Sequence, residues 1–353
     1  MMRIRRRTSP RTGWTFAVYA AAVLAGLVAT AGLIIVSGAP LGPSFHALAM
    51  GAVGSRAALV SSLVAATPLM FTGLATVIAY RAGVWTVGQE GQVLAGGMAA
   101  YQASLWLGGL PPILAIPGCI VAGIAGGALL GGLASFLKTR FAISEIVSTV
   151  MLNYLVTYLL SYLLAAVWSS SGNSVSYQQT PTLPGDLWLP TLGLGGKLHP
   201  GFLLAIAATL CLSILLRRTA LGYEVRAMGV NPVALRQRGT DTVRTILVVM
   251  LISGGLSALA GIGEVFGVSH RLTASSLTGI GFDGIIIGMI GNLSALGTLL
   301  AALFFGALHS GALFMNVMTG VPAALITALQ GLMLIFFLMA GVASQFELVR
   351  ERP

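Results

Sequence analysis

The sequence predicts an all-α polytopic membrane protein with about 8–10 transmembrane helices, some of them broken or re-entrant. Three observations predict this fold class: 56% of the 353 residues are hydrophobic, only 8% are charged, and the mean hydropathy is +0.93. Several apolar runs reach the roughly 20 residues that a helix needs to cross a bilayer. Because a soluble core needs far less apolar sequence, we expect one transmembrane domain over residues 14–342.

The first apolar run follows a cluster of arginines, as in a secretory signal peptide. It extends from Trp14 to Val36, which is longer than the usual signal core of about 7–15 residues. We therefore expect a retained first helix, preceded by a basic cytoplasmic arm at residues 1–13.

Three of the predicted spans are short for a full crossing: Gly91–Leu107, Phe202–Leu216 and Ile280–Ile290. Short segments interrupted by glycine are typical of broken or re-entrant helices, and for Phe202–Leu216 a misplaced boundary is the simpler interpretation. Eight crossings plus two re-entrant elements also fit. The ten candidate segments are Trp14–Val36, Ala57–Tyr80, Gly91–Leu107, Ile113–Leu137, Ile143–Trp168, Phe202–Leu216, Ile246–Val268, Ile280–Ile290, Leu296–Val317 and Val321–Val342.

The basic residues favour one orientation of these spans. If the N-terminus is inside, all of the 19 Lys and Arg residues except Arg56, Lys197 and Arg271 lie on the cytoplasmic side. This bias supports the orientation, because loops rich in basic residues resist translocation across the membrane. The net charge of +10 is then a property of loops beside the membrane rather than a sign of nucleic-acid binding. The tail at residues 343–353 is cytoplasmic, and the loop at 169–200 is extracytoplasmic, either a lid or docking element or a simple connector.

Polar side chains interrupt the apolar runs at two related places. Gly88-Gln89-Glu90-Gly91 and Gly281-Phe282-Asp283-Gly284 share a Gly-x-acid-Gly pattern, and each opens a short segment. A carboxylate persists within a membrane only where it faces protein or water, which predicts a translocation path and an inverted internal repeat. The alternative is that each acid stabilises the N-terminus of its own helix and contacts no solute.

Polar side chains also follow Glu145 at helical spacing, so most of them share one face of the predicted helix. Such a polar stripe either lines a path or forms hydrogen bonds to neighbouring helices. Aromatic candidates for contact with a flat solute include Phe71 and Tyr154, although Trp and Tyr also collect at membrane interfaces. The candidate pathway residues are Trp85, Gln89, Glu90, Gln92, Ser148, Asn153, Phe282 and Asp283.

The longest predicted cytoplasmic loop, residues 217–244, contains the signal for a short helix. Asn231 is a favourable N-cap, Pro232 suits the first helical position, and Gly239 suits the position after the last turn. The helix would expose Val233 and Leu235 and fit a groove on a cytoplasmic partner, whereas lipid headgroups are the alternative ligand for its arginines. The candidate coupling residues are Gly229, Asn231, Pro232, Arg236 and Arg238.

Catalytic and metal-binding patterns are missing from the sequence. It has no nucleotide-hydrolysing Gly-rich loop, and its four histidines and two cysteines, Cys119 and Cys211, are scattered. We expect a non-enzymatic chain with no catalytic residue, metal or cofactor of its own.

Four stretches, residues 85–92, 145–154, 229–232 and 281–284, resemble the permease subunits of bacterial ABC importers for simple sugars and nucleosides, a ribose-type, branched-chain amino acid permease-like family. The resemblance covers roughly residues 57 to 342 and is greatest to the nucleoside branch. Three stretches depart from the family pattern. Trp85-Thr86 replaces Phe-Asn, which bears on solute preference, Val233-Ala234-Leu235-Arg236 replaces an alanine-rich stretch, and Ala295 stands near a usual proline.

The resemblance implies a permease subunit in the bacterial plasma membrane, with both termini cytoplasmic, that forms the pathway for a nucleoside or related simple sugar. Its implied partners, besides membrane lipid, are a second permease subunit (identical or paralogous), an extracytoplasmic substrate-binding lipoprotein and a cytoplasmic ATPase. That ATPase would use the ATP and bind the loops that hold Asn231 and Pro232. From the residues alone, an ion-coupled secondary transporter of a small polar solute is the alternative.

Overall fold

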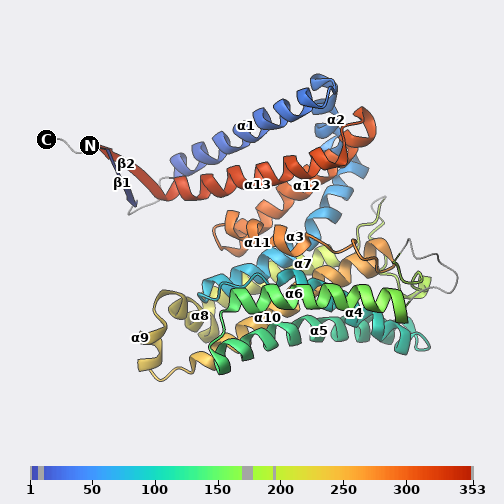
Figure 1. Ribbon diagram of the computed structural model, residues 1–353, viewed down its shortest axis with the longest axis vertical. Coiled ribbons are helices and arrows are strands. Elements are labelled where there is room, and N and C mark those ends of the chain that lie inside the picture. Colours follow the sequence, from blue (N-terminus) through green and yellow to red (C-terminus); the bar gives the residue numbers. More distant parts are fainter. Residues whose placement is uncertain (1, 7–11, 169–177, 194–195, 351–353) are drawn as a thin grey trace. The chain divides into compact units, whose positions relative to one another are not determined.

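The computed structural model describes residues 2–6, 12–168, 178–193 and 196–350 (Figure 1). They divide into two compact units: unit 1 comprises Met1–Ser62 and Ala307–Pro353, and unit 2 comprises Leu63–Gly306. Nearly all the regular structure of the described residues is helical, which confirms the predicted all-α membrane fold.

Unit 1 is built on two long helices that lie against each other, α1 (Thr12–Val36) and α13 (Ala323–Gln345). The rings of Tyr19 and Phe337 are 5.9 Å apart between centroids. The remaining elements are α2 (Leu41–Val53), the start of α3 (Arg56–Arg81), the end of α12 (Ala295–Thr319), and the antiparallel strands β1 (Met2–Arg6) and β2 (Phe346–Arg350).

Unit 2 holds the rest of α3 and α12 together with most of the other elements. Its α-helices are α4 (Gln89–Leu107), α5 (Pro112–Phe141), α6 (Glu145–Tyr162), α7 (Gly201–Arg218), α8 (Ala220–Val230), α9 (Pro232–Gln237), α10 (Thr242–Glu264) and α11 (Ile280–Ile290). Two π-helical turns, η1 (Leu163–Val167) and η3 (Val265–Ser269), extend α6 and α10, and a 3-10 turn, η2 (Gly185–Leu187), precedes α7.

Glycines hold α4, α5 and α10 close together in unit 2. Gly127 and Gly131 of α5 face the backbone carbonyls of Gly254 and Met250 in α10, and a methyl group at either position would overlap them. Gly261 of α10 meets the carbonyl of Val93 in α4 in the same way. Membrane helices gain stability from such close approach because lipid provides little hydrophobic driving force.

The predicted spans agree well with the helices of the structure. Among the described residues, 7 helices are long and apolar enough to cross a membrane. Each of the ten predicted segments contains a helix, although Ile143–Trp168 and Val321–Val342 begin two residues before α6 and α13. The segment Ile280–Ile290 coincides with α11, and α7 extends beyond Phe202–Leu216 at both ends, so the boundary of that prediction was wrong. The helices α2 and α8 were not predicted, because each is too short to span.

The described part of the predicted extracytoplasmic loop is bound to the segment after α10. The backbone N–H groups of Thr180 and Leu183 donate to the carbonyls of Leu272 and His270. The indole of Trp188 stacks on the imidazole of His270, with 3.9 Å between ring centroids. This part of the loop is therefore a packed cover rather than a free connector.

Candidate functional site

The two Gly-x-acid-Gly motifs meet in unit 2. The Glu90 carboxylate, in the first turn of α4, accepts hydrogen bonds from the backbone N–H groups of Gly279 (2.6 Å) and Gly281 (2.8 Å) at the start of α11. Gly279 has φ +93°, which an L-residue rarely adopts. Glu90 thus stabilises the positive end of α11 in addition to lying in the first turn of its own helix.

The irregular segment before α11 explains why this helix is short. Residues 270–279 contain no helix, and within them Leu272 and Leu277 are fully buried. Irregular backbone at membrane depth is tolerated where protein covers it. The broken helix predicted from the short segment Ile280–Ile290 is therefore present.

The first motif is also tied to α6. The Asn153 side chain donates to the carbonyl of Val87 (2.8 Å) and accepts from the N–H of Gly91 (2.9 Å). The hydroxyl of Thr149 accepts from the N–H of Val87 (3.2 Å). The polar stripe of α6 therefore bonds a neighbouring segment, and Ser148, which donates to the carbonyl of Glu145, is buried beside it.

The amides of the first motif are buried as well. Gln89 donates through Nε2 to the hydroxyl of Thr76 in α3 (3.2 Å). The carbonyl oxygens Oε1 of Gln89 and Gln92 have no hydrogen-bond partner among the described residues. Leaving a buried acceptor without a hydrogen bond is costly, so these two oxygens are unusual features of the site.

Two of the predicted pathway residues are exposed. Trp85 exposes 50% and Phe282 exposes 43% of their surface, and Asp283 is partly exposed. The Trp85 ring lies 4.7 Å from that of Tyr80, between centroids. Phe71, another aromatic candidate, is fully buried and cannot meet a solute in this structure.

The Trp85 backbone is fixed by a charged pair at the start of α6. Its N–H donates to Oε1 of Glu145 (3.4 Å), which also accepts from Nζ of Lys138 (2.6 Å). The sequence predicts that Glu145 lies on the polar stripe of this helix, but it indicates no partner for the carboxylate. The structure assigns it to a link between the end of α5 and the loop before α4.

The predicted loop helix exists as α9, with the predicted cap. Oδ1 of Asn231 accepts from the N–H groups of Val233 (3.0 Å) and Ala234 (3.1 Å), and Gly239 has φ +83°. Val233 is exposed as expected, but the expected exposure of Leu235 is wrong. Leu235 is buried because it packs into a core to which α8 contributes Val225 and Met228, and α8 was not predicted.

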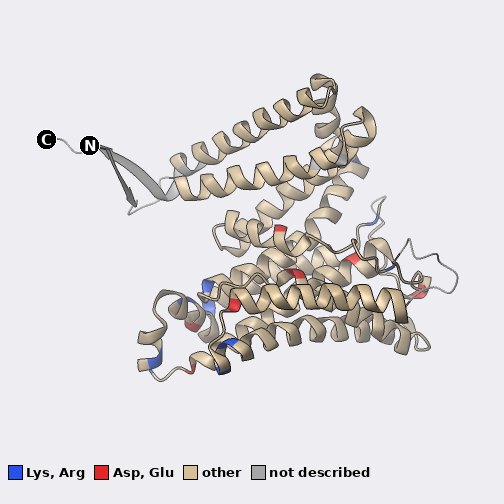
Figure 2. Ribbon diagram, in the orientation of Figure 1, with Lys and Arg blue, Asp and Glu red and all other residues tan. Residues whose placement is uncertain are grey.

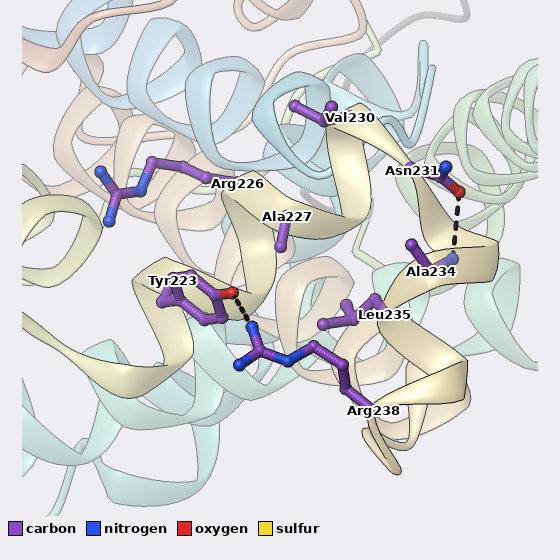
Figure 3. Close-up of a pocket in the computed structure, with 8 residues that line it drawn as sticks. All are labelled: Tyr223, Arg226, Ala227, Val230, Asn231, Ala234, Leu235 and Arg238. Carbon is purple, nitrogen blue, oxygen red and sulfur yellow. Dashed lines mark hydrogen bonds between the residues drawn. The ribbon is translucent and has the colours of Figure 1, made fainter.

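The helices α8 and α9 form an open groove of about 550 Å³ (Figure 3). The guanidinium of Arg238 donates to the hydroxyl of Tyr223 and lies 5.8 Å from the centre of that ring. Arg236 donates to the hydroxyl of Thr242 (2.8 Å). The groove is lined by Tyr223, Arg226, Ala227, Val230, Asn231, Ala234, Leu235 and Arg238.

The loop is joined to the membrane helices through Gly229. A methyl group at Gly229 would overlap the backbone carbonyl of Arg81, the last residue of α3. Arg81 in turn donates to the carbonyl of Leu293, just after α11 (2.7 Å). In unit 2 most Lys and Arg residues gather at the end that carries α8 and α9 (Figure 2), which agrees with the prediction that one side of the membrane domain is basic.

The similar proteins that we compared are all permease proteins of ABC transporters. The guanosine ABC transporter permease protein NupP of Bacillus subtilis is 30% identical over 89% of this chain and 90% of its own length. The glucose ABC transporter permease protein TsgB13 of Haloferax volcanii is 32% identical over 80% of this chain and 77% of its own. The nucleoside ABC transporter permease protein NupB of Lactococcus lactis is 27% identical over 83% and 82%.

The family assignment rests on residues 58–338, which contain both Gly-x-acid-Gly motifs, the groove and the glycine-packed helices. They match the family described as "Branched-chain amino acid transport system / permease component". This match favours an ABC permease over the ion-coupled carrier. The chain is therefore a multi-pass membrane permease and belongs to the branched-chain amino acid transport system permease family.

Proposed function

We propose that this chain forms the nucleoside pathway of a bacterial ABC importer. The observation that carries the proposal is its similarity, over at least four fifths of both chains, to permeases named for guanosine and nucleosides. The glucose permease TsgB13 is comparably similar, so a simple sugar is the competing cargo.

The groove between α8 and α9 is the proposed docking site for the ATPase. It combines apolar side chains with the guanidinium groups of Arg226 and Arg238, a surface suited to an acidic and apolar partner. Asn231 and Pro232 form the start of α9. Gly229 packs directly against the last residue of α3, so a movement of the groove on binding the ATPase would be transmitted to a membrane helix. The ATP is bound and used by that partner, and both termini lie on its side of the membrane.

We assign different roles to the predicted pathway residues. Trp85, Phe282 and Asp283 have exposed surface and are the proposed contacts for the cargo or its water. Gln89, Glu90, Gln92, Ser148 and Asn153 are buried and position the helices around the path.

The test is uptake by proteoliposomes that contain this chain, its second permease subunit, the ATPase and the binding lipoprotein. Nucleosides are compared with pentoses and hexoses, with and without ATP. We expect nucleoside uptake that requires every component. Uptake of sugars alone would overturn the nucleoside cargo, and gradient-driven uptake by the chain alone would overturn the importer.

A further inference from the structure

One face of α6 carries three exposed tyrosine rings, interspersed with exposed aliphatic side chains such as Met151 and Leu155. We call the three rings the tyrosine face: Tyr154, Tyr158 and Tyr162. They expose 58%, 71% and 62% of their surface, and their spacing of four residues places them on one side of the helix, each about 6 Å along the axis from the next. This side is opposite Asn153, whose amide holds the first motif.

The tyrosine face is unsuited to lipid. Tyr154 and Tyr158 flank Val156, the middle residue of the candidate span Glu145–Val167. Their hydroxyls make no hydrogen bond to any described residue of the chain, and an unpaired hydroxyl in the hydrocarbon layer is costly. Tyrosine on a lipid-facing helix belongs near the interfaces, not at the centre.

The helices α5 and α7 expose large apolar side chains but no tyrosine. Large exposed residues are aliphatic or Phe on α5, such as Leu129 and Phe136, and aliphatic on α7, such as Leu210 and Ile214. Among the described tyrosines, the only other exposed one is Tyr223, in the groove of α8 and α9. The three rings of α6 therefore form a localised feature.

We propose that the tyrosine face lines the solute path and that its rings stack on the flat base of the cargo. This inference rests on the proposed nucleoside function. An aromatic ring can stack on any base. A row of rings at helical spacing could therefore bind a base at successive positions along the path without hydrogen bonds specific to one base. The free hydroxyls offer partners to the sugar and to water in the path.

The first test is thiol labelling of the assembled, reconstituted transporter. In a Cys119→Ser/Cys211→Ser background, Tyr158→Cys is compared with Leu129→Cys, an equally exposed position on α5. We expect a water-soluble, membrane-impermeant methanethiosulfonate to label the Tyr158→Cys variant about tenfold faster than the Leu129→Cys variant, because thiols react as thiolates, which water favours. Equally slow labelling, or a disulfide at 158 to the second permease subunit without labelling, would overturn the proposal.

The second test measures initial uptake with saturating cargo-loaded binding lipoprotein. The pair Tyr154→Leu/Tyr158→Leu removes two rings, Tyr154→Phe/Tyr158→Phe keeps them, and Phe136→Leu on α5 is the matched control. We expect roughly a tenfold loss for the Leu pair, a smaller loss for the Phe pair and none for the control. Wild-type rates in the Leu pair, with the ATPase still coupled, would exclude a stacking role.

These outcomes separate the two proposals. If the wild-type complex carries only sugars, the nucleoside assignment and base stacking both fail, while labelling still decides whether the face lines a path. If the wild type carries nucleosides and residue 158 labels like residue 129, only the tyrosine face is overturned.

Discussion

At the scale of single residues, the Glu90 carboxylate joins α4 to the start of α11 and gives a direct test of this contact. Its two oxygens accept from the backbone N–H groups of Gly279, which precedes α11, and Gly281, in its first turn. Glu90→Gln replaces one acceptor with a donor and removes the charge at the helix N-terminus. We expect the variant to lose about 1.5–3 kcal/mol of stability, read as a lower thermal unfolding midpoint of the purified permease. An unchanged midpoint would contradict the bond between α4 and α11.

His199 gives a pH dependence at the same scale. Its ring is buried just before α7, and its Nδ1 accepts from the N–H of Gly201 (3.1 Å). Burial, with the nearby charge of His270, lowers the pKa of His199 to about 4. Protonation is therefore easier in the unfolded chain, where the pKa is about 6.5, and stability is lost as the pH falls from 6.5 towards 4.

We expect acidification from pH 7.5 to 5 to cost on the order of 2 kcal/mol through His199. His199→Asn retains an acceptor near Nδ1 but does not titrate, so it is the matched control. Thermal unfolding in detergent at both pH values checks this. Equal pH sensitivity in the wild type and His199→Asn would assign the effect elsewhere, for example to His270, whose pKa is also lowered by burial.

At the scale of elements, the α9 helix tests coupling. Asn231→Ala removes the side chain that accepts from Val233 and Ala234, a loss of about 1 kcal/mol for the helix start. We expect weaker stimulation of the ATPase by loaded binding lipoprotein, and lower uptake. Asn231→Ser keeps a capping oxygen and should behave like the wild type. Full coupling in Asn231→Ala and in a double variant, Asn231→Gly/Pro232→Gly, would exclude α9 as the docking element.

The contact between α5 and α10 provides a stability test with a control one residue away. A methyl group at Gly131 would overlap the carbonyl of Met250, whereas at Gly132 it would meet only a flexible end of Leu251 (3.1 Å). We expect Gly131→Ala to cost about 1–3 kcal/mol and Gly132→Ala to be neutral or stabilising, because alanine favours helix. Unfolding midpoints that fall equally would disprove the close approach.

Elements with strong local signals were predictable from the sequence, and elements made by distant contacts were not. The glycines around Ile280–Ile290 predicted the short helix α11, and the Asn231-Pro232 cap predicted the start of α9; both helices are present. No local pattern indicates that Glu90 bonds α11 rather than its own helix, because its partners are nearly 200 residues away in the chain. The burial of Leu235 depends likewise on α8, whose short sequence resembles no span.

At the scale of the whole molecule, the charge distribution predicts which loops face which side. Val233 lies in the basic loop and Asp186 in the loop bound to residues 266–273, and both are exposed. In intact cells of a Cys119→Ser/Cys211→Ser strain, we expect an impermeant thiol reagent to label Asp186→Cys and not Val233→Cys. Labelling of Val233→Cys from outside would reverse the orientation.

The glycine contacts among α4, α5 and α10 have a consequence for motion. Side chains can slide past one another by changing rotamer, but a carbonyl seated directly on a glycine has no such freedom. We therefore expect α4, α5 and α10 to move as one rigid group. The irregular residues 270–279 are tied to α4 by the hydrogen bond from Gly279 to Glu90, so we expect this segment to move with the three helices if the path opens to each side in turn.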